Sequence, residues 1–387
     1  MIGSPGVCPG MKPKTTKLLM VAIAAMALAV VLSLRRNAPK ASAPRQLENA
    51  GASPHDSPVL FQTTSSESQR RSARVLPNGP SEDAKHVLGE PPTPPADPDR
   101  RDSGGADPAN PRANWAVNVE FRAGGSAGKQ QIVSVLNREW EESNGSPTLY
   151  GFGQKTERWS LLDAASESEP YSKLELLWPY LSLDAAKRFT AEFAQQWLGA
   201  IEKAAPRIAP ATVRASEPPA AAARRARGLE ALRSEIEDAQ VIVALVAPEG
   251  RPFDGFKMWD ALRSLGLEWG DGDLFHWAAN AGDDSAFSVS TSTDPGYFFP
   301  EEAVAGHLHV EDLVFGLSIP RTYQPTVVLE AMIRAAKYVQ RRLGGNLVSA
   351  QREPLNEAAL RASLAQTVQR MTAAGIEPGS DAALQLF

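Results

Sequence analysis

Apolar residues recur along much of the chain with the spacing of strands and helices. Every second residue is apolar in residues 115–121, which is typical of a strand. Phe189, Phe193 and Trp197 lie four residues apart and predict one buried stripe on a long helix. The same reasoning predicts strands over residues 115–121, 148–152, 159–162, 174–178, 208–214, 241–247, 267–277, 286–292, 313–319 and 346–351, and helices over residues 127–140, 183–204, 220–237, 253–265, 325–343 and 357–373.

The predicted elements occur twice in nearly the same order. In each half the order is strand, helix, three strands, helix, strand, helix. Trp178-Pro179 ends a strand of the first half, and Ile319-Pro320 ends the corresponding strand 141 residues later. We interpret this as an internal duplication, with one copy in residues 114–238 and the other in residues 239–387. Chance is the alternative, because many chains alternate strands and helices in this way.

An uncharged apolar segment, residues 18–34, lies near the start of the chain. Its seventeen residues reach the short end of the length that spans a bilayer as a helix. We predict an uncleaved transmembrane anchor after a short tail, residues 1–17. A signal peptide is the alternative, because Ala41-Ser42-Ala43 resembles a cleavage site, although two arginines directly follow the apolar segment. The basic residues slightly favour the C-terminal flank, which predicts that the folded part lies in the cytoplasm.

Residues 35–113 have the composition of a linker. Thirteen of the 31 prolines of the chain lie in this stretch, and apolar periodicity is almost absent. Such a segment buries too little apolar surface to offset the entropy lost on ordering. We therefore predict a disordered, proline-rich tether between the membrane and the folded part.

Composition and charge exclude several classes of protein. The chain has 387 residues and a formal net charge of −5, whereas nucleic-acid-binding proteins usually carry a basic excess. We therefore predict no nucleic-acid partner. The single cysteine, Cys8, excludes a disulfide framework and any zinc site built from several cysteines.

Few residues are candidates for catalysis or metal binding. Asp271 and Asp273 flank Gly272 and are typical of a turn. His307 and His309 alternate, but no third metal ligand with suitable spacing accompanies them. The sequence contains no phosphate-binding loop, nucleophile elbow or cysteine–histidine constellation. We predict a protein that is not an enzyme and that uses no metal or cofactor.

Four segments of the second half form a recognisable set. They are the strand pair 266–276 (GLEWGDGDLFH), the loop 294–301 (DPGYFFPE), Ile319-Pro320 and the segment 344–347 (GGNL). In this order, and after an apolar anchor and a proline-rich linker, they resemble the C-terminal domain of the bacterial cell-division protein ZipA. The first half shares only the element order and residues 150–153 (YGFG), so its membership follows from the repeat alone.

The resemblance implies an α+β fold, an antiparallel sheet with helices packed on one face, here in two tandem copies. In the ZipA family the open face of the sheet binds the C-terminal peptide of the tubulin-like division GTPase FtsZ. The anchor of that family ties division filaments to the inner membrane. The resemblance therefore implies a single-pass inner-membrane protein that contacts the bilayer through residues 18–34 and binds the FtsZ C-terminal peptide or another division protein.

Strand alternation predicts which residues of the second half face a partner. Phe315, Leu317 and Ile319 are expected to point towards the helices. The predicted partner-binding face consists of Val241, Val243, Gly272, Ser290, Ser292, Val314 and Gly316. Most of these residues are small or polar, so we expect a groove that offers little apolar area to a peptide.

Two other functions remain open from the sequence. One is a membrane-tethered scaffold that kept the fold but binds another partner. The other is a periplasmic binding protein, which requires the opposite membrane topology.

Overall fold

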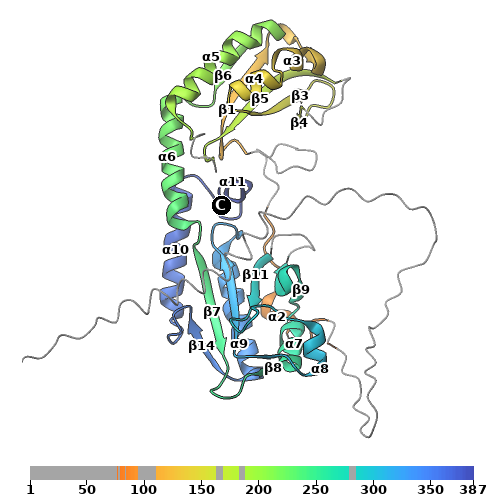
Figure 1. The fold of residues 1–387 in the computed structure, drawn as a ribbon, viewed down its shortest axis with the longest axis vertical. Coiled ribbons are helices and arrows are strands. Elements are labelled where there is room, and N and C mark those ends of the chain that lie inside the picture. The colour runs from red at the N-terminus through yellow and green to blue at the C-terminus, as the bar shows by residue number, and fades with distance from the viewer. Residues whose placement is uncertain are drawn as a thin grey trace, which may run out of the picture.

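Two antiparallel sheets, each with helices packed against it, form two units that lie one above the other (Figure 1). The structure is a computed structural model that describes residues 76, 79–82, 84–94, 110–162, 169–182, 188–278 and 285–387. We call residues 110–236 the N-terminal unit and residues 239–373 the C-terminal unit. The predicted α+β class with antiparallel sheets is confirmed.

The N-terminal unit contains a six-stranded sheet. Its strands are β1 (Asn114–Phe121), β2 (Ala127–Gly128), β3 (Thr148–Gly153), β4 (Trp159–Leu161), β5 (Pro170–Pro179) and β6 (Ala211–Ala215), and its helices are α3 (Lys129–Val135), α4 (Arg138–Ser143), α5 (Ala191–Ile208) and α6 (Pro219–Ile236). The strand order is β4-β3-β5-β1-β6, with β2 paired to β5. Trp115, Val117 and Val119 of β1 share one core with apolar residues of α5 and α6.

The C-terminal unit contains the second six-stranded sheet, in the order β14-β7-β13-β11-β10-β9. The strands are β7 (Gln240–Val246), β9 (Glu268–Gly270), β10 (Leu274–Ala278), β11 (Ser285–Ser290), β13 (Asp312–Ser318) and β14 (Asn346–Ser349), and the helices are α7 (Gly255–Ser264), α8 (Pro300–Ala305), α9 (Pro325–Leu343) and α10 (Glu357–Ala373). A two-stranded pair, β8 (Phe253–Asp254) with β12 (His309–Val310), lies beside it. Both α9 and α10 have the predicted bounds.

The two sheets agree at their centre and differ at one edge. In both, the strand that follows the long helix pairs with the first strand of the unit, which in turn pairs with the strand before that helix: β6-β1-β5 and β14-β7-β13. In the N-terminal unit β3, the earlier strand of its hairpin, lies beside β5, and β4 lies outside it. In the C-terminal unit β11, the later strand of its hairpin, lies beside β13, and β10 lies outside it. Because the two edge strands occupy exchanged positions, the predicted element-by-element match does not extend to the topology of this edge.

Two helices of the N-terminal unit differ from their predicted bounds. The predicted helix over residues 127–140 is two helices, α3 and α4, separated at Leu136 and Asn137. The long helix α5 begins at residue 191 and not at 183, because the Thr190 side chain accepts a hydrogen bond from the Phe193 amide and caps the helix there. Phe189 precedes the helix but is still buried in the core.

Part of the predicted disordered linker is an ordered segment. Residues 85–88 form a short helix, α2 (Lys85–Leu88), that packs on α9 and buries Ala84, Val87 and Leu88 in the core of the C-terminal unit. The Arg334 side chain donates a hydrogen bond of 2.9 Å to the Val87 carbonyl. The disorder prediction is therefore wrong for this segment, because its few apolar residues find a complementary surface on α9.

The C-terminal tail, residues 374–387, lies between the two units and ends in α11 (Asp381–Leu386) (Figure 1). Ile376, Leu386 and Phe387 are buried in the core of the N-terminal unit. Gln385 accepts a hydrogen bond of 3.0 Å from the Asn114 side chain, while the Gly379 amide donates one of 2.9 Å to the Pro320 carbonyl of the C-terminal unit. The sequence patterns did not predict this tail, which connects both units.

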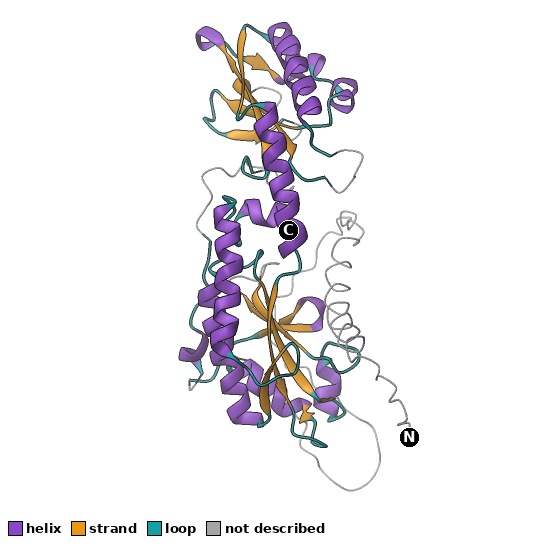
Figure 2. Ribbon diagram, turned by 90° about the vertical axis from the view of Figure 1, so that its left-hand side faces the viewer, coloured by secondary structure: helices purple, strands orange, loops and turns teal. Residues whose placement is uncertain are grey.

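Helices α6 and α10 also join the units and form one column along the side of the molecule in Figure 1. Arg370 of α10 pairs with Glu235 of α6. Ala239, at the connection between the units, packs against both cores. Figure 2 shows the two sheets and this column from the side. The contacts on both sides of the connection favour a fixed arrangement of the units.

The predicted anchor, residues 18–34, lies outside the described residues. In the described part of the chain, no helix combines the length and the apolar character that a membrane crossing requires.

Two glycines of the tail allow a test of its contact with the C-terminal unit. Gly379 has a φ of +67°, and a Cβ atom there would lie 2.2 Å from the Tyr323 amide nitrogen; Gly375 has a φ of +76° but has nothing within 4 Å of a Cβ position. Alanine at either position adds the cost of left-handed backbone, about 1–2 kcal/mol. We expect Gly379→Ala to lower the free energy of unfolding by about 2 kcal/mol more than Gly375→Ala, because only the first also creates a backbone clash. Urea denaturation of both variants measures the difference, and equal effects would contradict the docking of the tail.

Candidate partner-binding sheet face

The pairing of β7 with β13 decides which face of the C-terminal sheet each side chain occupies. Val241 pairs with Leu317 and Val243 pairs with Phe315, and all four side chains are buried in the core beneath α9. Our prediction that Val241 and Val243 lie on the open face is therefore wrong. The prediction that Phe315 and Leu317 point towards the helices is confirmed.

The opposite face carries an apolar strip of which the prediction included only Val314. It consists of the outward side chains of β7, β13 and β14, namely Ile242, Ala244, Val246, Val314 and Val348. Neither hydrophobic core includes these residues. Ala244 is buried and the other four are half-buried. The face thus offers more apolar area than the sequence prediction allowed, because the outward residues of β7 are apolar too.

Small and polar residues continue this face beyond the apolar strip. Gly316 of β13 lies between Ile242 and Ser288, its partners on the two neighbouring strands. A Cβ atom built on Gly316 meets nothing within 4 Å, so the space above this position is open. Ser290 pairs with Val314 and shares the same face. These positions of Ser290, Val314 and Gly316 agree with the predicted face.

The other two predicted residues lie outside the strands. Gly272 lies in an exposed turn between β9 and β10, where it has a φ of +65°. Ser292 follows β11 and binds the Asp312 carboxylate. Neither contributes apolar surface to the face.

A buried carboxylate marks one end of the apolar strip. Asp312 is only 1% exposed and lies at the start of β13. Its oxygens accept hydrogen bonds from the Ser292 amide (2.7 Å), the Ser292 hydroxyl (2.5 Å) and the Thr291 hydroxyl (3.1 Å). Arg352 completes the network, since its Nη2 atom pairs with Asp312 Oδ2 and donates a 2.8 Å hydrogen bond to the Ser292 hydroxyl.

Arg352 reaches Asp312 from the far edge of the sheet. It lies in the turn after β14, and Pro354 and Leu355 then pair back along β14. Since β7 lies between β14 and β13, the Arg352 side chain crosses the open face over β7.

The electrostatic state of Asp312 follows from these contacts. Burial alone raises the pKa of the carboxyl group, but the hydrogen bonds from Ser292 and the Arg352 guanidinium outweigh it. The pKa of Asp312 therefore lies below its ordinary value, and the group is ionised at neutral pH.

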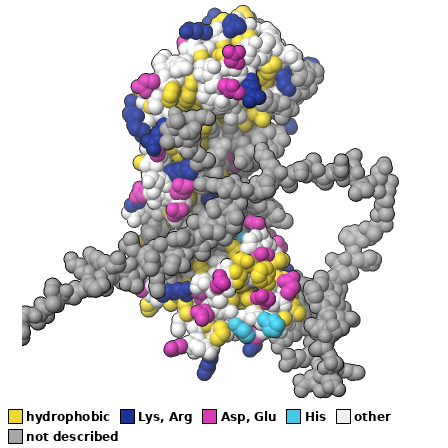
Figure 3. Space-filling model, in the orientation of Figure 1, with side chains coloured by type: hydrophobic (Ala, Val, Ile, Leu, Met, Phe, Trp, Pro, Cys, Tyr) yellow, Lys and Arg dark blue, Asp and Glu magenta, His cyan; other side chains and the backbone are white. Residues whose placement is uncertain are grey.

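The candidate metal-binding residues of the sequence do not come together in a site. His307 lies in a loop and His309 in β12, both exposed, and no group of three possible metal ligands occurs among the described residues. Figure 3 shows basic side chains standing beside acidic ones on the described surface. These features give no support to a metal centre or to a continuous basic surface on this side of the molecule.

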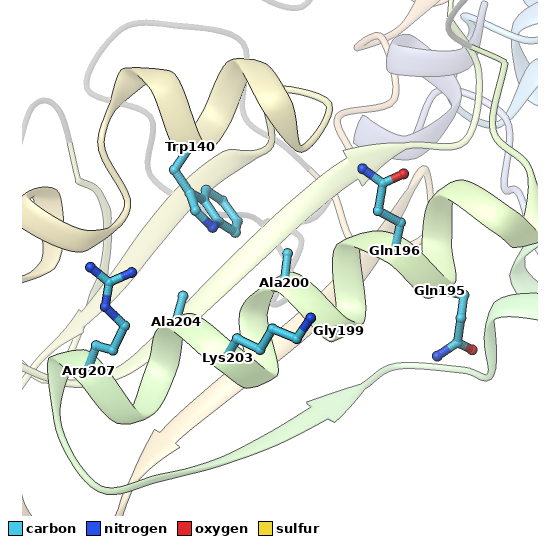
Figure 4. A pocket seen from close by; sticks show the side chains of 8 residues that line it. All are labelled: Trp140, Gln195, Gln196, Gly199, Ala200, Lys203, Ala204 and Arg207. Carbon is cyan, nitrogen blue, oxygen red and sulfur yellow. The ribbon is translucent and has the colours of Figure 1, made fainter.

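A hollow of about 520 Å³ lies in the N-terminal unit between Trp140 of α4 and one side of α5 (Figure 4). Its lining residues are Trp140, Gln195, Gln196, Gly199, Ala200, Lys203, Ala204 and Arg207. The lining contains two cations and an indole but no carboxylate, thiol or hydroxyl. The hollow therefore holds no carboxylate to pair with its two cations, and the sheet face remains the better candidate.

Comparison with known proteins finds relatives of the C-terminal unit. Residues 239–366 match the family model "ZipA, C-terminal FtsZ-binding domain". The resemblance predicted from the sequence is thereby confirmed for the C-terminal unit. The match ends inside α10 and includes neither the C-terminal tail nor the N-terminal unit.

Curated ZipA proteins resemble about a third of the chain. The Haemophilus ducreyi cell division protein ZipA is 30% identical over 133 residues, which are 33% of this chain and 38% of that protein. The Marinobacter nauticus protein is 32% identical over 111 residues, 28% of this chain and 32% of its own length. The chain thus covers less than two fifths of the length of these ZipA relatives, so the likeness concerns one domain.

The lowered pKa of Asp312 predicts a loss of stability in acid. A carboxyl group whose pKa is lower in the folded state stabilises the protein above its unfolded pKa, about 3.9, and loses this contribution as the pH falls through the folded value. We expect the free energy of unfolding to fall more steeply below about pH 4 in the wild type than in Asp312→Asn. Urea denaturation at a series of pH values measures both slopes. Parallel curves would mean that the carboxylate does not contribute.

Proposed function

We propose that this protein is a membrane-tethered bacterial cell-division protein that links FtsZ filaments to the inner membrane. The proposal rests on the match of residues 239–366 to the FtsZ-binding domain of ZipA. In this chain the sheet of the matched unit has an open apolar strip. An extended or helical peptide gains most of its affinity by burying apolar side chains, and this strip offers the matching surface. We propose Ile242, Val314 and Val348 as its main contacts.

The proposed function requires no catalysis. The ZipA relatives are named for cell division, and the candidate face holds a serine-rich half and one ion pair, between the buried Asp312 and the half-exposed Arg352. We propose a binding protein without cofactor or metal. Its partners are the FtsZ C-terminal peptide, or another division protein, and the lipid bilayer.

The proposed arrangement along the chain explains why a linker is useful. Residues 18–34 would anchor the chain, and the proline-rich stretch after them would act as a tether, now shortened by the docked residues 84–88. A tether confines the binding face near the membrane and raises its effective concentration there without new contacts. We place both units in the cytoplasm, where FtsZ filaments assemble.

We further propose that residues 114–238, which include most of the N-terminal unit, are a divergent copy of the C-terminal domain. The shared order of the three central strands and of the two long helices supports this. The exchanged edge strands would then be a later change. On the face without helices this unit carries Ala116, Tyr150 and Leu177 as a small apolar cluster, in place of the strip of the C-terminal unit.

A substitution on the apolar strip tests the proposed binding. Ile242→Asp places a charge where the peptide would bury apolar surface, so we expect the affinity for a synthetic FtsZ C-terminal peptide to fall at least about tenfold. Val327→Asp is the matched control, because Val327 is 51% exposed on α9 and lies on the helix side of the sheet. Fluorescence anisotropy measures both. Equal binding by the wild type and Ile242→Asp would exclude the strip as the site.

A second experiment tests the cellular role. We expect a fluorescent protein fused to the C-terminus of the full chain to be cytoplasmic and to form rings at midcell. A periplasmic location would exclude FtsZ as the partner. Uniform membrane fluorescence would favour a scaffold with another partner.

A further inference from the structure

The Arg352 guanidinium uses only part of its hydrogen-bonding capacity. Nη2 serves both Asp312 and Ser292, whereas Nε and Nη1 make no hydrogen bond with the described residues. The Arg352 side chain is 47% exposed, although its partner Asp312 is 1% exposed. Nε and Nη1 are therefore free donors at the end of the apolar strip, and their N–H bonds point in different directions.

The backbone holds Arg352 in place. The residue has a φ of 62°, in the left-handed region that non-glycine residues rarely adopt. The turn is closed by hydrogen bonds from the Arg352 amide to the Ser349 carbonyl (2.9 Å) and from the Ser349 amide to the Glu353 carbonyl (2.8 Å). A buried carboxylate on one side and a fixed turn on the other thus orient the guanidinium before any ligand binds.

We propose that Arg352, oriented by Asp312, is a carboxylate-binding subsite for the peptide that occupies the apolar strip. A carboxylate accepts charge-assisted hydrogen bonds from guanidinium N–H groups, and with Nη2 occupied the free Nε and Nη1 each offer one such donor to a single carboxylate oxygen. The inference rests on the proposed function and adds the chemistry of the ligand: an apolar peptide that also carries an acidic group.

The structure also limits the spacing of the ligand groups. The open position at Gly316 lies four residues along β13 from Asp312. Four residues of a strand span about 13 Å. An extended peptide that inserts a bulky apolar side chain at Gly316 would therefore reach Arg352 with a carboxylate about four residues away. The acidic group is either a side chain or the C-terminal carboxylate of the peptide.

The test compares charged and neutral forms of the FtsZ C-terminal peptide on the full chain. One neutral form has amides in place of its acidic side chains, and a second is amidated at its C-terminus. We expect the wild type to bind the charged peptide about three- to tenfold more tightly than one of the two neutral forms, since a half-exposed charged hydrogen bond contributes modestly. The form that loses affinity identifies the carboxylate.

Variants connect this preference to Arg352. Arg352→Gln alone leaves Asp312 buried without its cation, so the double variant Asp312→Asn/Arg352→Gln is used as well, because it keeps the charge balance. We expect both to bind all forms of the peptide equally. Arg341→Gln is the control, since it removes a cation on α9, where Arg341 lies over the Tyr338 ring.

Each outcome decides the inference. Equal binding of charged and neutral peptides by the wild type overturns it and leaves the proposed function standing. A preference that survives in the double variant also overturns it. Failure of the wild type to bind any form removes both the inference and the proposed function.

Discussion

The alternation of side chains on β7 and β13 is the constraint on which the rest of the C-terminal unit depends. Leu313, Phe315 and Leu317 are buried under α9 together with the odd-numbered residues of β7. Their burial fixes the register of the pair, because a shift by one residue would expose the whole set. The same register sends Val314, Gly316 and Asp312 to the other face. The core thus creates the open face and its carboxylate.

The open face combines two kinds of surface with different roles. The apolar strip can contribute affinity through the apolar area that a peptide buries on it. A single ion pair at its end can fix the orientation of that peptide. Asp312 is stabilised as an anion by hydrogen bonds from Ser292 and by Arg352, so the network keeps its charge without a ligand. The strip and Arg352 together would favour binding of a peptide that is both apolar and acidic.

Sequence reasoning predicted the face of some strands and failed on one. In β11 and β13, serine and glycine alternate with large apolar residues, and the pattern alone identified Ser290, Val314 and Gly316 as outward. In β7 all residues from 241 to 246 are apolar, so alternation carries no information about the face. Only the pairing of Val243 with Phe315 decides it. The error on Val241 and Val243 therefore has a specific physical cause.

The sequence by itself determined the α+β class, the bounds of α9 and α10 and the likeness of one unit to the ZipA domain. These follow from local periodicity, capping residues and short motifs, which a linear pattern records. The tertiary structure alone decided that residues 84–88 dock on α9, that the C-terminal tail joins the two units and that Arg352 meets Asp312. Each of these contacts joins residues far apart in the chain, and its energy depends on a complementary surface that exists only after folding.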